Sequence, residues 1–317
     1  MLIAARNAIL AGGGGQPSGG YWGLCFTAEQ ANSTVAMSGI AHSRTPTVTL
    51  LYSTNPADPT SWAEFIVGST TVTLANVGDK VWIKAGPGGN TNFSYGINLY
   101  NYFSLTGLVA ASGNIMSLLN GEEETFELSA NYAFTKFFIN CTALTTAPAL
   151  PATTLTTSCY TSMFSGCSLL TTAPALPATT LTTASSRANG VYANMFSGCT
   201  SLTVAPELPA TSLQLYCYYQ MFSGCTSLTV APELPATTLQ RECYRGMFSG
   251  CTSLATIRTA QTQAWGDGTT QDPTYSWVDG VAATGTFYCP TALGTDATIT
   301  RGIHYCPAGW TVINTDA

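Results

Sequence analysis

The middle of the chain repeats one order of apolar and polar positions. Cys141, Cys167, Cys199, Cys225 and Cys251 mark equivalent positions that lie 26, 32, 26 and 26 residues apart. Between them the sequence stays close to "CTSLTVAPELPATSL" followed by "CYYQMFSG". A unit this short cannot bury its own apolar side chains, so we expect successive units to stack into a solenoid around a shared core.

Each unit has two halves with different patterns. In "CYTSMFSGC" the residues Cys159, Met163 and Cys167 are four positions apart, which predicts a short helix that ends at Gly166. The other half, "LLTTAPALPATTL", is rich in threonine and holds two prolines. Proline is tolerated at strand ends and edges, so this half predicts a short strand and a turn. We therefore expect one strand and one helix in each unit.

The boundaries of the repeat can also be read from its frame. Counting back from Cys141 by one unit gives Ile115, and the unit that starts there lacks the prolines but carries Glu122, Glu123, Glu124 and Glu127. This polar unit is expected to cap the stack at its beginning. The one long step contains six extra residues between Leu181 and Phe196, which predicts a surface loop. The frame is lost after Ile257.

Residues 21–113 have the alternation of short strands. Segments such as "TVTLLYST", "TTVTLAN" and "DKVWIKAG" are separated by the turn sequences "NPADP" and "NVGD". This spacing predicts an immunoglobulin-like β-sandwich. No linker separates it from the first unit, so we expect the two parts to share an interface.

The two ends differ from these parts. Residues 258–317 hold Trp265, Trp277, Phe287, Tyr305 and Trp310, enough aromatic mass to cover the last unit, which predicts a C-terminal cap. Residues 1–20 combine a short apolar stretch (Leu2, Ile3, Ile9 and Leu10) with a run of glycines. The stretch lacks the order of a signal peptide and is too short to span a bilayer. It is interpreted as a docking peptide on a flexible tether, or alternatively as a disordered terminus.

The repeat frame C-x-x-L-x-x-A-P-x-L-P, followed by M-F-x-x-C, resembles the BspA-like leucine-rich-repeat surface proteins of gut and oral bacteria and their phages. The resemblance covers about residues 115–257. Together with the patterns above, it gives the expected organisation, a mainly β fold with short helices: an N-terminal tether (1–20), an immunoglobulin-like sandwich (21–113), a leucine-rich-repeat solenoid (114–257) and a C-terminal cap (258–317). It also implies display outside the cell and binding to a host or neighbouring surface.

Charge restricts the partners. Only 8% of residues are charged, with 10 Lys and Arg against 16 Asp and Glu, and no basic cluster occurs. Nucleic-acid binding therefore has no electrostatic basis. A surface of uncharged polar residues is common in extracellular and virion proteins, which favours the same setting as the resemblance.

The eleven cysteines are expected to be structural. The first column is Cys141, Cys167, Cys199, Cys225 and Cys251, and the second is Cys159, Cys217 and Cys243. Ala133 and Val191 occupy the second column's remaining places, so the position requires a small buried apolar group, which a free thiol resembles. Occasional disulfides remain the alternative, with Cys289 and Cys306 the best placed pair. No C-x-x-C motif occurs, and neither a metal site nor a cofactor is predicted.

Catalysis has no support in the sequence. The two histidines, His42 and His304, stand apart from any nucleophile or carboxylate pair in the sequence. We therefore expect the protein not to be an enzyme.

The positions that vary between units predict a binding surface instead. The stretch before Met-Phe changes from unit to unit while its flanks do not, so these side chains are expected to face solvent. Tyrosine and arginine carry interface energy out of proportion to their number. The candidate residues are Arg187, Asn189, Gln214, Tyr216, Tyr219, Gln220, Gln240, Arg241 and Arg245; neutral drift of surface positions is the alternative.

Two functions are compatible with these observations. The first is a recognition protein displayed on a phage virion or a bacterial surface, or secreted, which is docked to a larger assembly by its N-terminus and binds a host glycan or protein through the repeats. The second is a structural virion component that contacts only other subunits. Either could form a homo-oligomer.

Overall fold

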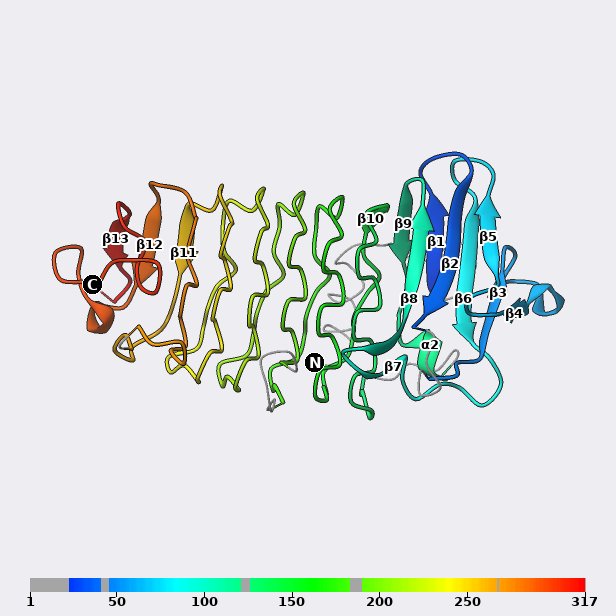
Figure 1. The fold of residues 1–317 in the computed structure, drawn as a ribbon, viewed down its shortest axis with the longest axis horizontal. Coiled ribbons are helices and arrows are strands. Elements are labelled where there is room, and N and C mark those ends of the chain that lie inside the picture. The colour runs from blue at the N-terminus through cyan, green and yellow to red at the C-terminus, as the bar shows by residue number, and fades with distance from the viewer. Residues whose placement is uncertain (1–22, 41–45, 121–125, 183–189, 267, 317) are drawn as a thin grey trace.

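The computed structural model describes residues 23–40, 46–120, 126–182, 190–266 and 268–316. The molecule is elongated, with two sheets at one end, a row of stacked rungs in the middle and a small parallel sheet at the other end (Figure 1). The strands are β1 (Leu24–Ala28), β2 (Ser33–Gly39), β3 (Leu50–Ser53), β4 (Ala63–Phe65), β5 (Thr71–Leu74), β6 (Lys80–Ala85), β7 (Ser94–Gly96), β8 (Leu99–Thr106), β9 (Val109–Ser112), β10 (Leu144–Thr146), β11 (Thr256–Arg258), β12 (Thr286–Cys289) and β13 (Thr311–Asn314). The helices are a short α2 (Ser117–Asn120) and the 3-10 turns η1 (Pro59–Ser61) and η3 (Thr291–Leu293).

Strands β1 to β9, together with β10 from the repeat region, form two sheets with the strand orders β10-β9-β1-β6-β3-β4 and β5-β2-β8-β7. Side chains alternate across them: β5 exposes its threonines and buries Val72 and Leu74. The two sheets meet through Phe26 of β1 and Phe103 of β8, whose ring centroids are 4.8 Å apart. The mainly β fold predicted from the alternation is confirmed, while the immunoglobulin-like assignment stays a prediction.

The short helices predicted in each unit are wrong: residues 156–167 and their equivalents form consecutive turns. Ser158, Ser162 and Gly166 have positive φ angles of 59°, 54° and 77°, one in every four residues. An α-helix contains no such residues. The four-residue spacing of Cys159 and Met163 therefore comes from a repeated turn and not from a helical face.

Backbone hydrogen bonding explains why the turns are preferred. In the interior of an α-helix each N–H bonds to the carbonyl four residues earlier in its own segment, but here alternate N–H groups bond between rungs. Tyr160 N donates to Val191 O at 3.3 Å and Phe164 N to Met195 O at 2.9 Å. The N–H groups between them bond to the carbonyl three residues earlier, at positions 159, 161, 163, 165 and 167. We call this part of each rung the turn side (residues 156–167, 190–199, 214–225 and 240–251).

The proline-containing half is also less regular than predicted. It forms single bridges such as Thr172 with Val204 and Thr180 with Ser212. In the described residues of the stack, longer strands occur only at its two ends, as β10 and β11. Pro174 and Pro177 lack the N–H that a continuous ladder requires. The rungs are therefore held together mainly by their turn sides and their core.

Two columns of aromatic rings run through that core. Phe138, Phe164, Phe196, Phe222 and Phe248 stack at centroid distances of 5.4, 5.6, 5.7 and 5.8 Å, with interplanar angles of 7° or less. Tyr160, Tyr192, Tyr218 and Tyr244 form a parallel column at 6.1, 5.8 and 6.0 Å. Each of these rings is at most 1% exposed. Stacked pairs of this kind contribute about 0.5–1.5 kcal/mol beyond their area burial.

The sheets act as the rung before the first repeat. β10 pairs in parallel with β9, and Phe103 N of β8 donates to Phe137 O at 2.9 Å. Cys141 Sγ donates to Phe103 O at 3.1 Å, just as Cys167 Sγ donates to Phe138 O one rung later. The shared interface expected from the missing linker is present.

The repeat frame continues past Ile257, although its pattern of residue types is lost there. Phe248 N donates to Trp277 O at 2.8 Å and Gly250 N to Asp279 O at 2.7 Å, in the register of the earlier rungs. Trp277 thus takes the place of the repeated Met, 30 residues after Met247. β11, β12 and β13 then pair in parallel. The first part of the segment assigned to the cap is therefore a further, degenerate rung, and the assignment of a separate cap stays a prediction.

Trp277 closes both aromatic columns. Its ring lies 6.3 Å from Tyr244 and 6.2 Å from Phe248. On its other side it meets Trp265 at 6.1 Å and Phe287 at 6.2 Å. Of the aromatic residues assigned to the cap, Trp277 therefore covers the last rung, with Trp265 and Phe287 packed behind it.

Candidate functional site

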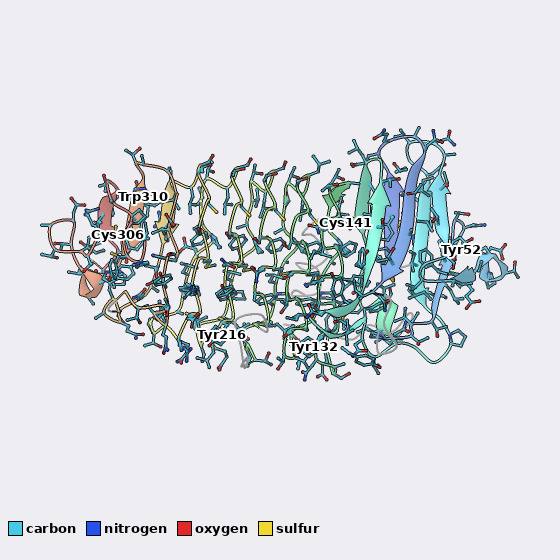
Figure 2. All side chains as sticks on the ribbon, viewed as in Figure 1. Tyr52, Tyr132, Cys141, Tyr216, Cys306 and Trp310 are labelled. Carbon is cyan, nitrogen blue, oxygen red and sulfur yellow. The ribbon has the colours of Figure 1, made fainter. Side chains whose placement is uncertain are left out.

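The predicted binding residues that the structure describes lie on adjacent rungs and meet along one edge. Tyr216 N donates to Arg241 O at 3.4 Å, and Gln220 N donates to Arg245 O at 2.8 Å. Figure 2 shows Tyr132 and Tyr216, which hold equivalent positions, along the same long border of the stack. We call this surface the variable edge; its members are Gln214, Tyr216, Tyr219, Gln220, Gln240, Arg241 and Arg245.

Exposure differs along the variable edge. Gln240 and Arg241 are exposed, and Tyr219, Gln220, Gln214 and Arg245 are half-buried. Tyr216 is only 7% exposed, so the prediction that it faces solvent is wrong. The guanidinium of Arg241 on the next rung lies 5.9 Å from the Tyr216 ring centroid and helps to cover it.

Glu242 lies beneath the two arginines and was not predicted. Its side chain is 0% exposed, and its carboxylate is 3.4 Å from Arg241 Nε and 3.6 Å from Arg245 Nη1. Glu242 occupies the same positive-φ position in its rung as Tyr216 does in the previous one. A buried carboxylate needs such partners, so the contact fixes the direction of both arginines. The signal in the sequence was an acidic residue between two arginines in a unit otherwise poor in charge.

Two residues of the C-terminal part extend the variable edge. The Arg245 guanidinium lies 4.5 Å from the centroid of the Tyr275 ring, and Tyr275 stacks on His304 at 4.4 Å. Ser276 N donates to His304 Nδ1 at 2.7 Å, which fixes the imidazole. The missed signal is that Tyr275 stands in the frame of Arg245, two residues before Trp277.

The variable edge brings polar groups and aromatic ring faces together on adjacent rungs. Its polar groups are guanidinium, phenol, amide and imidazole groups, together with the buried carboxylate of Glu242 beneath the two arginines. Within the described ranges, no group of three or more His, Cys, Asp and Glu side chains is placed to hold a metal ion. Ring faces and guanidinium groups suit contact with a partner surface.

Some predicted residues lie outside the described part of the chain. These are Arg187 and Asn189 of the inserted loop, and Leu2, Ile3, Ile9 and Leu10 of the N-terminal stretch.

The predicted cysteines form two buried columns. In the first, each thiol donates to the phenylalanine carbonyl of the preceding rung; Cys199 Sγ, for example, lies 3.2 Å from Phe164 O. In the second, Cys159, Cys217 and Cys243 are 0% exposed, as are Ala133 and Val191 in the matching places. All eleven cysteines are free thiols, Cys289 and Cys306 included. The first column consists of Cys141, Cys167, Cys199, Cys225 and Cys251.

Burial makes these thiols a source of alkaline instability. Desolvation raises the pKa of Cys199 from its ordinary 9.0 to about 12, and that of Cys141 likewise. Between these values the unfolded chain has lost its thiol protons while the folded chain keeps them, so the free energy of unfolding falls as pH rises through this window. Urea titrations from about pH 7 to about pH 11 will show this decline. Cys199→Ala is expected to make it shallower, and an unchanged slope would contradict the assignment.

No match to this chain is found among protein-family models, curated proteins or solved structures. In the described part of the chain, no helix has the length and apolar character needed to cross a bilayer.

Proposed function

We propose that the protein is a non-enzymatic recognition protein displayed on a virion or cell surface, which binds a host glycan or protein through the variable edge. In this proposal the two-sheet part is an immunoglobulin-like spacer, the rungs are a BspA-like leucine-rich-repeat solenoid, and the cap ends it. Residues 1–20 would dock the protein to its larger assembly.

The observation that carries the proposal is where variation occurs. The buried columns repeat Phe, Tyr, Met and Cys almost without change, whereas the variable edge presents a different set of side chains on each rung. Arg241 has 46% of its side chain exposed, and its direction is fixed by the buried Glu242. An oriented arginine beside tyrosines has the composition of an interface hot spot.

A purely structural role in a virion is the second candidate, and a different surface favours it. Val204 and Val230 hold equivalent positions on neighbouring rungs and are 55% and 53% exposed. Adjacent exposed apolar side chains are typical of contacts between proteins. In that case the stack would contact other subunits rather than a host.

The test truncates the two exposed residues of the variable edge together with the half-buried Tyr219. In the triple variant Tyr219→Ala, Gln240→Ala and Arg241→Ala, binding of labelled protein to a panel of gut bacterial and epithelial cells is expected to fall about 10-fold or more, because two lost hot-spot contacts cost at least about 1.4 kcal/mol. Flow cytometry measures the binding. The matched control is Thr179→Ala, Thr211→Ala and Thr237→Ala, on exposed threonines of the same stack.

Equal binding by the two triple variants would remove the variable edge as the recognition surface. The structural role is favoured by two results together. The unmodified protein binds no cells, and the double variant Val204→Asp with Val230→Asp loses self-association or assembly.

A further inference from the structure

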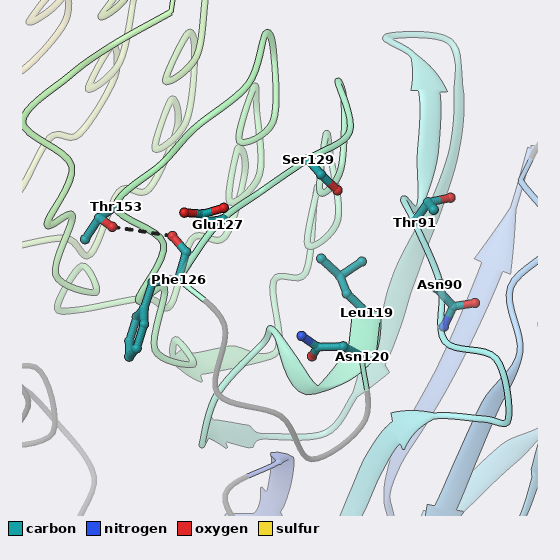
Figure 3. Close-up of a pocket in the computed structure, with 8 residues that line it drawn as sticks. All are labelled: Asn90, Thr91, Leu119, Asn120, Phe126, Glu127, Ser129 and Thr153. Carbon is teal, nitrogen blue, oxygen red and sulfur yellow. Dashed lines mark hydrogen bonds between the residues drawn. The ribbon is translucent and has the colours of Figure 1, made fainter.

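A cavity of about 530 Å³ lies where the two sheets meet the first rungs. Figure 3 shows Phe126, Glu127 and Thr153 on one side, Asn90 and Thr91 on the other, and Leu119 and Asn120 between them. It is separate from the variable edge and shares no residue with it. Its lining residues are Asn90, Thr91, Leu119, Asn120, Phe126, Glu127, Ser129 and Thr153.

One wall is fixed by Asn90. Its side-chain amide donates to Leu118 O at 2.8 Å and to Thr49 O at 3.0 Å, and its Oδ1 accepts from Thr49 N at 2.8 Å. The Asn90 N–H also donates to Leu119 O at 2.6 Å. Gly89 permits this approach, because a Cβ there would lie 2.5 Å from Leu119 O. The loop and α2 therefore form a rigid wall.

The opposite wall is fixed by pairing between the first two rungs. Thr153 N donates to Phe126 O at 2.8 Å, and Leu128 N donates to Thr154 O at 2.9 Å. Glu127 and Thr154 form a parallel bridge. Backbone bonds thus hold this wall and leave the side chains of Glu127 and Ser129 facing solvent. A cavity with both walls held in this way is formed before any ligand arrives, which reduces the cost of ordering on binding.

The lining chemistry points to a small hydroxylated ligand. Phe126 and Leu119 are the apolar residues of the lining, and Phe126 is 38% exposed, so its ring offers a face against which the C–H face of a sugar ring can pack. Thr91 and Ser129 supply hydroxyl groups that both donate and accept, and Glu127 supplies acceptors. An apolar patch with a few polar groups converging on it is the usual composition of a ligand site.

Charge decides which sugars fit. Among the lining residues that the structure describes, Glu127 is the one charged residue, and neither lysine nor arginine is present. A phosphate, sulfate or carboxylate on the ligand would be repelled by Glu127 and would meet no cation in this part of the lining. We propose that this cavity is a binding site for a neutral pyranose, either a single residue or the end of a glycan.

The experiment uses the full chain and four neutral probes, the methyl pyranosides of glucose, galactose, mannose and N-acetylglucosamine. Saturation-transfer NMR and calorimetry are expected to show millimolar binding of at least one of them. Phe126→Ala and the isosteric Glu127→Gln should each weaken that binding about 10-fold, a loss of about 1.4 kcal/mol. Tyr95→Ala, which removes a 58% exposed ring elsewhere, should leave it unchanged.

Several outcomes would overturn the proposal. These are no binding of any neutral probe, binding that survives both cavity variants, tighter binding of a methyl sialoside, or a preference for tetramethylammonium over every sugar. Equal melting temperatures of wild type and Glu127→Gln will exclude a folding defect. The triple variant of the variable edge should bind the glycoside normally, so failure of this site and failure of the proposed function can be told apart.

Discussion

Replacement of Trp277 by alanine is expected to lower the free energy of unfolding by about 3–5 kcal/mol. Trp277 is 0% exposed and is the last ring of both aromatic columns. Its Nε1 also donates to Tyr305 O at 2.8 Å. The substitution leaves a cavity at the end of the stack, exposes the ring of Phe248 and removes a buried hydrogen bond. Urea denaturation followed by circular dichroism will measure the loss.

Trp62→Ala is the matched control. Trp62 is half-buried at the opposite end of the molecule, where Lys84 Nζ lies 4.2 Å from its ring centroid. Losing this contact should cost about 1 kcal/mol or less. If the two tryptophan variants are equally stable, Trp277 does not close the columns.

Deletions should show that a single rung can be removed without loss of folding, whereas the sheets cannot. Removing residues 200–225, one whole unit, joins Cys199 to Thr226 and restores the sequence Cys-Thr-Ser-Leu. Because each rung contacts only its neighbours, we expect this shorter chain to fold cooperatively. Residues 114–317 alone should not fold, because Phe137, Phe138 and Cys141 would lose the β8 residue Phe103 that covers them.

Size-exclusion chromatography, circular dichroism and dye binding to exposed apolar surface will distinguish these results. Deletion of residues 200–212, half a unit, is the control. It also shortens the chain, but it places the later rungs out of register with the earlier ones, so it is expected to disrupt folding. A well-folded 114–317 fragment would show that the sheets are an independent domain and not the first rung. An unfolded whole-unit deletion would show that the rungs are not equivalent.

The repeat predicted the core because equivalent positions recur. Cys199, Phe196 and Tyr192 return in each unit, and side chains that return at a fixed interval can stack only on one another. The local backbone was predicted less well. A spacing of four residues is shared by a helix and by a chain of turns, and the left-handed positions are held by residues such as Ser158 and Glu242, which carry no glycine signal.

The degenerate final rung was hidden for a related reason. Trp277 and Val278 replace the repeated Met and Phe, and the step of 30 residues breaks the count. What identifies the rung is its backbone bonding, with Phe248 N to Trp277 O in register. The hydrogen-bond register was kept while the residue types of the repeat changed.

The candidate sites could not be predicted from the sequence, because they depend on contacts between distant segments. The burial of Tyr216 follows from Arg241 on the next rung, and Glu242 acquires its role from the same packing. The cavity has walls from residues 90–91 and 126–129, which meet only because the sheets continue into the stack. Single-unit patterns give no information about such neighbours.

The turn side also gives the molecule a polarity. Its inter-rung N–H groups all point toward the C-terminal end, so the terminal rung presents donors that have no successor. Instead, Val278 N donates a hydrogen bond to Ile303 O, and Ser276 N donates one to His304 Nδ1. Any lengthened or shortened version of this protein must therefore keep a closing segment that supplies acceptors, and two copies could join end to end only in one orientation.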